Sequence, residues 1–115
     1  MAYPGTDKNQ EDLKGRVLEA AALVDYQDGA VVSREVMRGE KGTVTLFSFD
    51  QGQGLSEHTA PFDALAHILD GEAEVVIAGE PLRLGAGDMV IMPAGKPHAL
   101  SAVRPFKMML VMIRT

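Results

Sequence analysis

Two stretches of this sequence decide its fold. Residues 52–71 read GQGLSEHTAPFDALAHILDG, and residues 87–102 read GDMVIMPAGKPHALSA. In both, short apolar runs are closed by glycine or proline, the residues that most often mark turns. The first stretch contains His58 and the second contains His98. Apolar runs of this length between turn residues are typical of β-strands joined by tight turns.

The same pattern continues on both sides of these stretches. From Ala30 onward, apolar runs recur at a spacing of roughly 8–12 residues, with Gly or Pro at nearly every break. This spacing predicts an all-β sandwich or barrel, because no long helices alternate with the runs as a parallel α/β sheet requires. The predicted strands cover residues 31–38, 43–49, 55–58, 64–69, 72–78, 81–84, 89–92, 98–102 and 106–113.

The segment before Ala30 has a different character. Residues 1–12 are polar and contain Pro4 and Gly5, which predicts a loose tail. Residues 13–27 include Leu18–Val24, a run with high helix propensity that is closed by Asp28 and Gly29. We therefore expect a tail and a short helical segment over residues 1–29, followed by a single barrel over residues 30–115.

Composition and charge exclude several classes of protein. The 115 residues include 11 Lys and Arg against 16 Asp and Glu, a net charge of -5, which favours neither nucleic acid nor an anionic membrane as a partner. The absence of cysteine excludes disulfides, thiolate nucleophiles and iron–sulfur clusters. We find no apolar run long enough to span a membrane and no signal peptide, so we expect a cytoplasmic protein.

The spacing of glycine, proline and histidine in the two stretches resembles that of the cupin superfamily, small conserved barrels of the jelly-roll or double-stranded β-helix type. The first cupin motif is Gly, five residues, His-X-His, three or four residues, Glu, six residues and Gly. The second is Gly, five residues, Pro-X-Gly, two residues, His, three residues and Asn. The chain fits these motifs at Gly52, His58, Gly71, Gly87, Pro93, Gly95 and His98. The resemblance implies a cupin barrel, and the propensity of the preceding residues adds a short N-terminal helical turn to it.

The chain departs from the motifs at three positions that matter for function. In metal-binding cupins, the resemblance implies, the two His and the Glu of the first motif and the His of the second hold the metal. Here Ala60 and Ala64 stand in place of the second His and the Glu, and Ala102 stands in place of the Asn. His58 and His98 remain as candidate ligands for a divalent transition metal such as Zn, Ni, Fe, Mn or Cu. Catalytic zinc sites usually have three protein ligands, so two imidazoles predict weak binding.

Alternation along the strands predicts what lines the interior. Residues of equal parity share a face of a strand, so His58, Ala60 and Ala64 are expected to point inward together. His67 has the opposite parity, and we do not expect it to be a third ligand unless a bulge near Pro61 inverts the register. A pocket lined by alanine and two imidazoles suits a small, partly apolar ligand. The predicted lining residues besides the histidines are Ser56, Ala60, Ala64, Ala66, Leu100 and Ala102.

Three functions are compatible with this pocket. The sequence favours a small-molecule binder, metal-independent or weakly metal-binding, in which His58 and His98 are polar anchors or catalytic acid–base groups. The first alternative is a metal-dependent cupin enzyme of dioxygenase, isomerase or decarboxylase type, with the same two histidines as ligands. The second is a structural module with a vestigial pocket. The sequence leaves open whether the protein is an enzyme.

The last predicted strand indicates a further partner. Residues 106–113 are apolar on both faces, more than one small core needs, which together with the cupin resemblance predicts a homodimer. Met108 and Met112 share one face of this strand, and Met109 lies on the other. A cluster of thioethers can bind Cu(I), but core packing is the interpretation that the sequence favours for these methionines.

Overall fold

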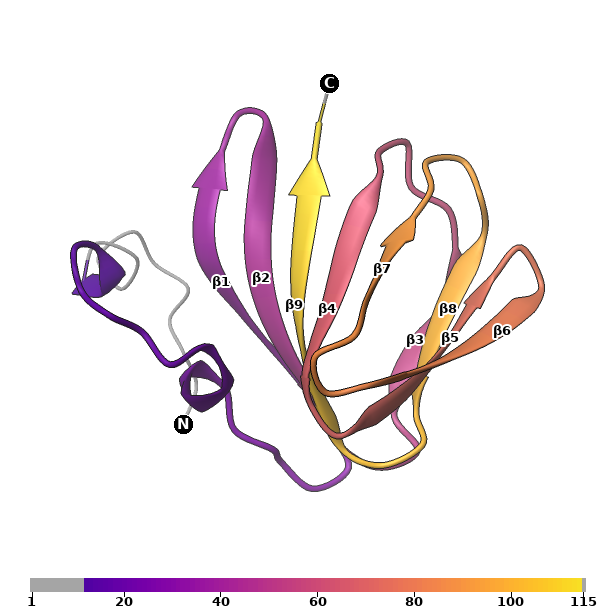
Figure 1. Cartoon of the computed structure of the whole chain (residues 1–115), viewed down its shortest axis with the longest axis horizontal. Coiled ribbons are helices and arrows are strands. Elements are labelled where there is room, and N and C mark those ends of the chain that lie inside the picture. Colours follow the sequence, from indigo (N-terminus) through magenta and orange to yellow (C-terminus); the bar gives the residue numbers. More distant parts are fainter. Residues whose placement is uncertain (1–11, 115) are drawn as a thin grey trace.

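The chain folds into a β-barrel made of two antiparallel sheets. The computed structural model describes residues 12–114 (Figure 1). Nine strands follow one short 3-10 helix in the described part of the chain. Their bounds are η1 Ala20–Leu23, β1 Val31–Gly39, β2 Gly42–Phe49, β3 Gly54–His58, β4 Ala64–Asp70, β5 Glu72–Ile77, β6 Glu80–Gly85, β7 Met89–Met92, β8 His98–Ala102 and β9 Phe106–Ile113.

The strands form one five-stranded and one four-stranded sheet. The order in the first is β1-β2-β9-β4-β7, and in the second it is β3-β8-β5-β6. Strands that are neighbours in space are often distant in the sequence, as expected of a jelly roll (Figure 1). The prediction of an all-β barrel is confirmed, and each predicted strand is present within one or two residues of its expected bounds.

The core lies between the sheets and follows the alternation of each strand. Ala64, Ala66 and Ile68 of β4 are buried, and the residues between them are more exposed. At the other end of the core, the rings of Phe49 and Phe106 stack with centroids 4.3 Å apart. A stacked aromatic pair is worth about 0.5–1.5 kcal/mol beyond the area that it buries. The two rings therefore hold β2 and β9 together in the core.

The N-terminal segment is less helical than the sequence predicts. Only η1, a single 3-10 turn of four residues, forms within the predicted helical run, and Glu19 gives it no side-chain cap. The physical reason is competition for backbone carbonyls, because side chains on the outer face of the five-stranded sheet bind them. Ser48 donates to the carbonyl of Asp25 at 2.7 Å, and Lys107 donates to the carbonyl of Ala21 at 2.6 Å.

The hydrogen bonds from Ser48 and Lys107 hold the N-terminal segment against the barrel. Val24 is completely buried against the sheet.

The loose tail predicted for residues 1–12 lies, except for Asp12, outside the described residues. Within residues 12–114 no helix has the length and apolar character needed to cross a membrane.

The turn between β4 and β5 depends on Gly71, one of the motif glycines. Its φ of +79° lies in the left-handed region that residues with a side chain rarely adopt. A Cβ at this position would also lie 1.8 Å from the carbonyl oxygen of Pro105, far inside contact distance. The backbones of the two turns are therefore in direct contact, and only glycine allows it.

We predict that Gly71→Ala destabilises the protein much more than Gly87→Ala. Gly87 also has a positive φ, of +93°, but a Cβ there would meet no atom within 4 Å. Backbone strain alone costs about 1–2 kcal/mol, whereas overlap with the Pro105 backbone should raise the loss at Gly71 to at least about 3 kcal/mol. Urea denaturation of both variants measures the difference. Equal losses in the free energy of unfolding would show that the contact of Gly71 with the Pro105 backbone does not restrict the residue at position 71.

Candidate functional site

His58 and His98 meet at one end of the barrel. His58 is the last residue of β3 and His98 is the first residue of β8, and the two are register partners. Their ring centroids are 4.4 Å apart, with the rings inclined at 67° in an edge-to-face arrangement. His98 is 4% exposed, whereas His58 is open to solvent. One imidazole therefore belongs to the wall of the barrel, and the other stands at its mouth.

Both imidazoles have the same backbone contact. The Nδ1 atom of His58 lies 2.7 Å from the carbonyl oxygen of Ser56, and that of His98 lies 3.2 Å from the carbonyl oxygen of Lys96. A carbonyl oxygen only accepts hydrogen bonds, so each Nδ1 must carry the proton and act as the donor. In the neutral rings, the Nε2 atoms are then left with a free lone pair. Two nitrogen acceptors are thus available at this end of the barrel.

A small cavity of about 40 Å³ lies beside the two rings. Five of its lining residues are predicted from the sequence: His58, Ala60, Ala64, His98 and Leu100. Among the described residues that line it there is no Asp, Glu, Lys or Arg. The imidazoles are the strongest hydrogen-bonding groups in an otherwise apolar wall.

Three predicted lining residues lie elsewhere. The register of β3 shifts between Leu55 and His58, so parity does not continue along the strand, and Leu55 lines the cavity where Ser56 was expected. Ser56 is exposed. Ala66 is covered because its register partners, Val90 and Leu110, carry larger side chains.

Ala102 is also outside the cavity lining. It is buried in the core near the other end of β8. It lies four positions along the strand from His98, which corresponds to roughly 13 Å. It therefore contributes to the core and not to the wall of the cavity.

The cavity wall also contains methionines, a residue type for which the sequence favours core packing over Cu(I) binding. Met92, Met108 and Met112 all line it. Met92 and Met112 are both register partners of Ala64, one on each side of β4. The equal parity of Met108 and Met112 was a signal that they share a face, but the pairing of β7 and β9 with β4 cannot be read from one sequence.

His67 lies on the outer face of the five-stranded sheet, away from the cavity. Its register partners are Met109 and Met89. No inversion of β4 occurs, because Ala64 and Ala66 both face the core. Within residues 12–114, no three His, Cys, Asp or Glu side chains come together as a metal-binding group would require. The residues present do not fit the three-histidine-and-glutamate metal site that the cupin resemblance implies.

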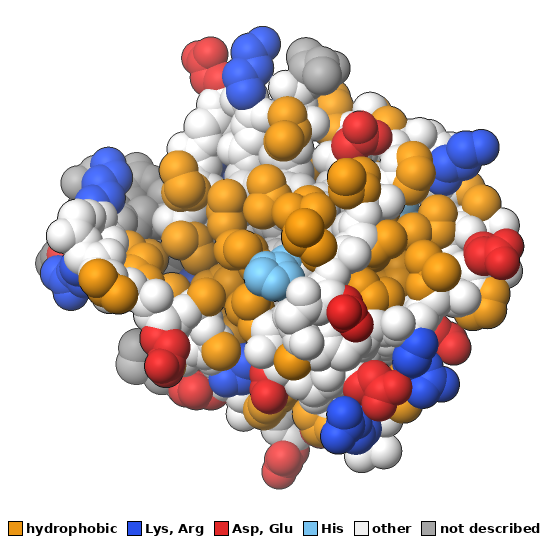
Figure 2. Space-filling model, viewed as in Figure 1, with side chains coloured by type: hydrophobic (Ala, Val, Ile, Leu, Met, Phe, Trp, Pro, Cys, Tyr) orange, Lys and Arg blue, Asp and Glu red, His pale blue; other side chains and the backbone are white. Residues whose placement is uncertain are grey.

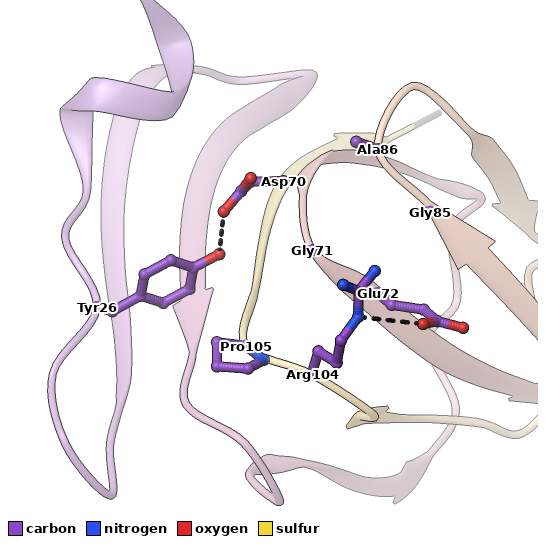
Figure 3. A pocket seen from close by; sticks show the side chains of 8 residues that line it. All are labelled: Tyr26, Asp70, Gly71, Glu72, Gly85, Ala86, Arg104 and Pro105. Carbon is purple, nitrogen blue, oxygen red and sulfur yellow. Dashed lines mark hydrogen bonds and ion pairs between the residues drawn. The ribbon is translucent and has the colours of Figure 1, made fainter.

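A larger hollow, of about 510 Å³, lies at the opposite end of the barrel (Figure 3). Its charged and polar groups are paired with one another. The Tyr26 hydroxyl donates to Asp70 at 2.5 Å, and Arg104 donates to Glu72 at 3.3 Å. Because these groups already have partners, we assign the hollow to structural contacts. The hydrogen bond from Tyr26 joins the N-terminal segment to Asp70, and the ion pair of Arg104 with Glu72 joins the loop before β9 to β5.

The titration of these groups follows from the same contacts. Burial of the phenol and its hydrogen bond to Asp70 raise the pKa of Tyr26 well above its usual value. The hydrogen bond from Arg83, together with the charges of Arg83 and Arg104, lowers the pKa of Glu72 against the opposing effect of desolvation. Tyrosine therefore stays protonated and Glu72 stays ionised at neutral pH, as a stable network requires.

The chain is similar in fold and sequence to several solved structures. A conserved protein of unknown function from Streptococcus pyogenes, SPY1581, is 38% identical, with a TM-score of 0.84 over 88% of this chain and 89% of that one. A cupin superfamily protein from Desulfitobacterium hafniense is 29% identical, with a TM-score of 0.84 over 89% of this chain and 94% of that one.

Among curated proteins, the chain is similar to the dimethylsulfoniopropionate lyase DddQ of Ruegeria pomeroyi. The two are 48% identical over 51 residues, which is 43% of this chain but only 25% of the lyase. The matched segment therefore spans a quarter of the lyase's length. A family model of the cupin domain matches residues 45–114, more than half of the sequence. The chain therefore belongs to the cupin family.

Proposed function

We propose that this cupin is a binding protein whose barrel holds a very small guest between the imidazoles of His58 and His98. The observation that supports this most directly is the matched pair of Nδ1 contacts to backbone carbonyls. They orient both rings and leave two Nε2 acceptors beside an apolar cavity. An apolar pocket with a few oriented polar groups is the usual form of a small-molecule site.

The size of the cavity limits the guest. Pockets for drug-sized ligands measure roughly 300–1,000 Å³, whereas this cavity measures about 40 Å³. One water needs roughly 10–15 Å³ by the same measure. The guest therefore has only a few non-hydrogen atoms, unless the flexible methionine side chains in the wall move to enlarge the space.

The imidazoles can take part in binding in two ways. A neutral Nε2 accepts a hydrogen bond from a hydroxyl or an acid group of the guest. It can also accept a proton from the guest, as the imidazole of a general base does. The two histidines could therefore act as anchors for the guest in a binding protein or as general bases in an enzyme.

A second candidate function is an elimination reaction, and the similarity to the dimethylsulfoniopropionate lyase favours it. Elimination from such a substrate breaks the carbon–sulfur bond and removes one proton from the neighbouring carbon. The products are dimethyl sulfide, acrylate and a proton, and the proton would pass to Nε2 of His58 or His98. Only a quarter of the lyase is matched, so this candidate ranks below binding.

The proposal predicts the tautomers of the two histidines. In the neutral form, His58 and His98 should both carry their proton on Nδ1, because Nδ1 faces a carbonyl oxygen in each. Long-range proton–nitrogen correlation spectra of the imidazoles distinguish the two tautomers, with His67 on the outer face as an internal reference. A proton on Nε2 in either residue would remove an acceptor that the proposed site needs.

Guest binding is tested with isopropanol, isobutyric acid and phenol, three probes of increasing size that each carry one hydrogen-bond donor. We expect the smaller probes to shift the NMR signals of the two histidines and of the Met92 and Met112 methyl groups. His58→Ala and His98→Ala should each weaken binding about three- to tenfold, the equivalent of one lost hydrogen bond. His67→Ala is the matched control and should have no effect.

The outcomes separate the candidate functions. No shift of the cavity signals at high probe concentration, or an equal effect of His67→Ala, would contradict the binding proposal and favour a structural barrel. Incubation with dimethylsulfoniopropionate, followed by detection of dimethyl sulfide, tests the elimination separately. If the wild type releases dimethyl sulfide and His58→Ala or His98→Ala does not, elimination is the function.

A further inference from the structure

A second apolar hollow lies outside the barrel, at the turn between β1 and β2. Figure 1 shows this turn beside the C-terminal end of β9, and hydrophobic side chains gather over the strands of the five-stranded sheet in Figure 2. A groove of about 420 Å³ lies at the turn, and its apolar side chains include Met37, Val44, Val111 and Ile113. This volume is within the range of roughly 300–1,000 Å³ that is usual for a small-molecule site.

Strand register explains why the surface is hollow at this point. Two neighbouring rows of residues run across β1, β2 and β9, and side chains two residues apart on a strand face the same side of the sheet. The row next to the turn has two glycines and only one side chain, so it leaves an empty space beside the other row. The other row is Met37, Val44 and Val111, and the row next to the turn is Gly39, Gly42 and Ile113.

The backbone does not require glycine at Gly39. Its φ lies outside the left-handed region, and a Cβ there would meet no atom within 4 Å. Gly42 differs, because a Cβ at that position would lie 2.5 Å from the carbonyl oxygen of Met112. Glycine weakens a strand, and within strands it often marks a place where a ligand or another backbone approaches closely. No atom of the described residues makes such an approach at Gly39, so the space is open to a ligand.

The charged groups around the groove leave a positive end at the turn. Among residues 12–114, no hydrogen bond or ion pair holds the side chains of Glu40, Lys41 and Arg114. Arg114 lies beside the turn, because its backbone N–H donates to the carbonyl of Lys41 at 2.6 Å. Arg38 is already held by two hydrogen bonds to Glu35, of 2.9 and 2.7 Å. Two unpaired cations and one unpaired carboxylate therefore lie together, on a chain whose net charge is -5.

We propose that this groove binds a small amphiphilic acid, with its hydrocarbon part in the groove and its anionic head at Lys41 and Arg114. Each buried methylene contributes about fourfold to affinity, whereas one exposed ion pair contributes about fivefold at most. The hydrocarbon therefore supplies most of the affinity, and the head fixes the orientation. A medium-chain fatty acid such as octanoate has both parts. The site uses neither His58 nor His98, so it stands independently of the function proposed for the cavity.

The two unpaired cations decide the sign of the head. A cationic amphiphile would meet both Lys41 and Arg114 at the only end of the groove that carries unpaired charge among the described residues. A neutral amphiphile could bury its hydrocarbon there but would gain nothing from the turn. An acid gains from both, because opposite charges attract even where water weakens the attraction.

The first test is a titration with hexanoate, octanoate and decanoate, followed by NMR. Met112 lines both hollows, so the methyl groups of Met37 and Met92 report on the groove and the cavity separately. We expect the Met37 signal to shift, with affinity rising up to about fourfold per methylene until the hydrocarbon fills the groove. The Met92 signal should stay in place. A shift of Met92 without a shift of Met37, or equal affinities of the three acids, would overturn the proposal.

Gly39→Val tests whether the empty space is the site. Valine suits a strand and meets no atom there, so the variant should resist urea at least as well as the wild type. Its side chain takes the place of two or more methylenes of the acid, so octanoate affinity should fall at least about tenfold. Ser101→Val, on an exposed position of β8 in the other sheet, is the matched control and should bind octanoate normally. A folded Gly39→Val that binds octanoate like the wild type would show that the acid is not in the groove.

Lys41→Gln tests the position of the acid head. This variant should weaken octanoate binding about two- to fivefold, the effect of one exposed ion pair, and leave the binding of neutral octanol unchanged. Lys96→Gln removes the same charge from an exposed loop residue outside the groove lining, and it should change neither affinity. Equal effects of the two lysine variants, or equal losses for octanoate and octanol, would contradict an acid head at the turn.

Two further outcomes distinguish a ligand from other occupants. If no acid shifts the Met37 signal and Gly39→Val lowers the mass measured by light scattering, a second copy of the chain fills the groove and the proposal is wrong. His58→Ala should leave octanoate binding unchanged, and a loss in that variant would place the acid at the cavity instead. Any of these failures leaves the function proposed for the cavity to its own tests, because isopropanol binding is followed at Met92.

Discussion

The inside of this barrel must be filled by its own side chains, and the rest of the structure depends on that constraint. Protein interiors are as densely packed as organic crystals, so a small residue at an inward position leaves space that neighbours must occupy. Ala64 lies between Met92 and Met112, and the remaining cavity is only about 40 Å³. Methionine is unbranched and flexible, so it fills such irregular space well. The alanines at the motif positions and the sulfur in the wall therefore belong to one packing solution.

The strands could be predicted from the sequence because glycine and proline mark their ends. Gly71 is required at its turn by a positive φ and by the closeness of Pro105, and such positions leave a signal in any single sequence. The candidate site could be predicted only as far as strand alternation holds. It holds along β4, where Ala64 faces inward and His67 outward. It fails in β3, where the shift before His58 replaces Ser56 with Leu55.

The parts that could not be predicted depend on contacts between distant segments. The helical run near Leu23 has the right propensity, but the sheet competes for its carbonyls through Ser48 and Lys107, and only one 3-10 turn remains. Likewise, no local pattern shows that β7 and β9 both pair with β4. Without that pairing, Met92 and Met112 are two apolar residues in separate strands. With it, they become neighbours of the two imidazoles.

The two ends of the barrel use polar groups in opposite ways. At the end shown in Figure 3, Glu72 and Asp70 have partners on neighbouring segments, and these contacts hold the structure together. At the other end, the backbone engages only one nitrogen of each histidine and leaves the second available. The free Nε2 atoms are therefore available as hydrogen-bond acceptors for a guest or for water.

Strand alternation gives the same strands an inner face, which lines the cavity, and an outer face. On β9, Met112 lines the cavity while its neighbour Val111 lies on the outer face of the sheet, and on β7 the same holds for Met92 and Ile91. Because protein interiors are densely packed, a change on the outer face of the sheet is also felt at the wall of the cavity. In a barrel this small, the wall of the cavity and the outer surface of the molecule are the two faces of the same β-sheet.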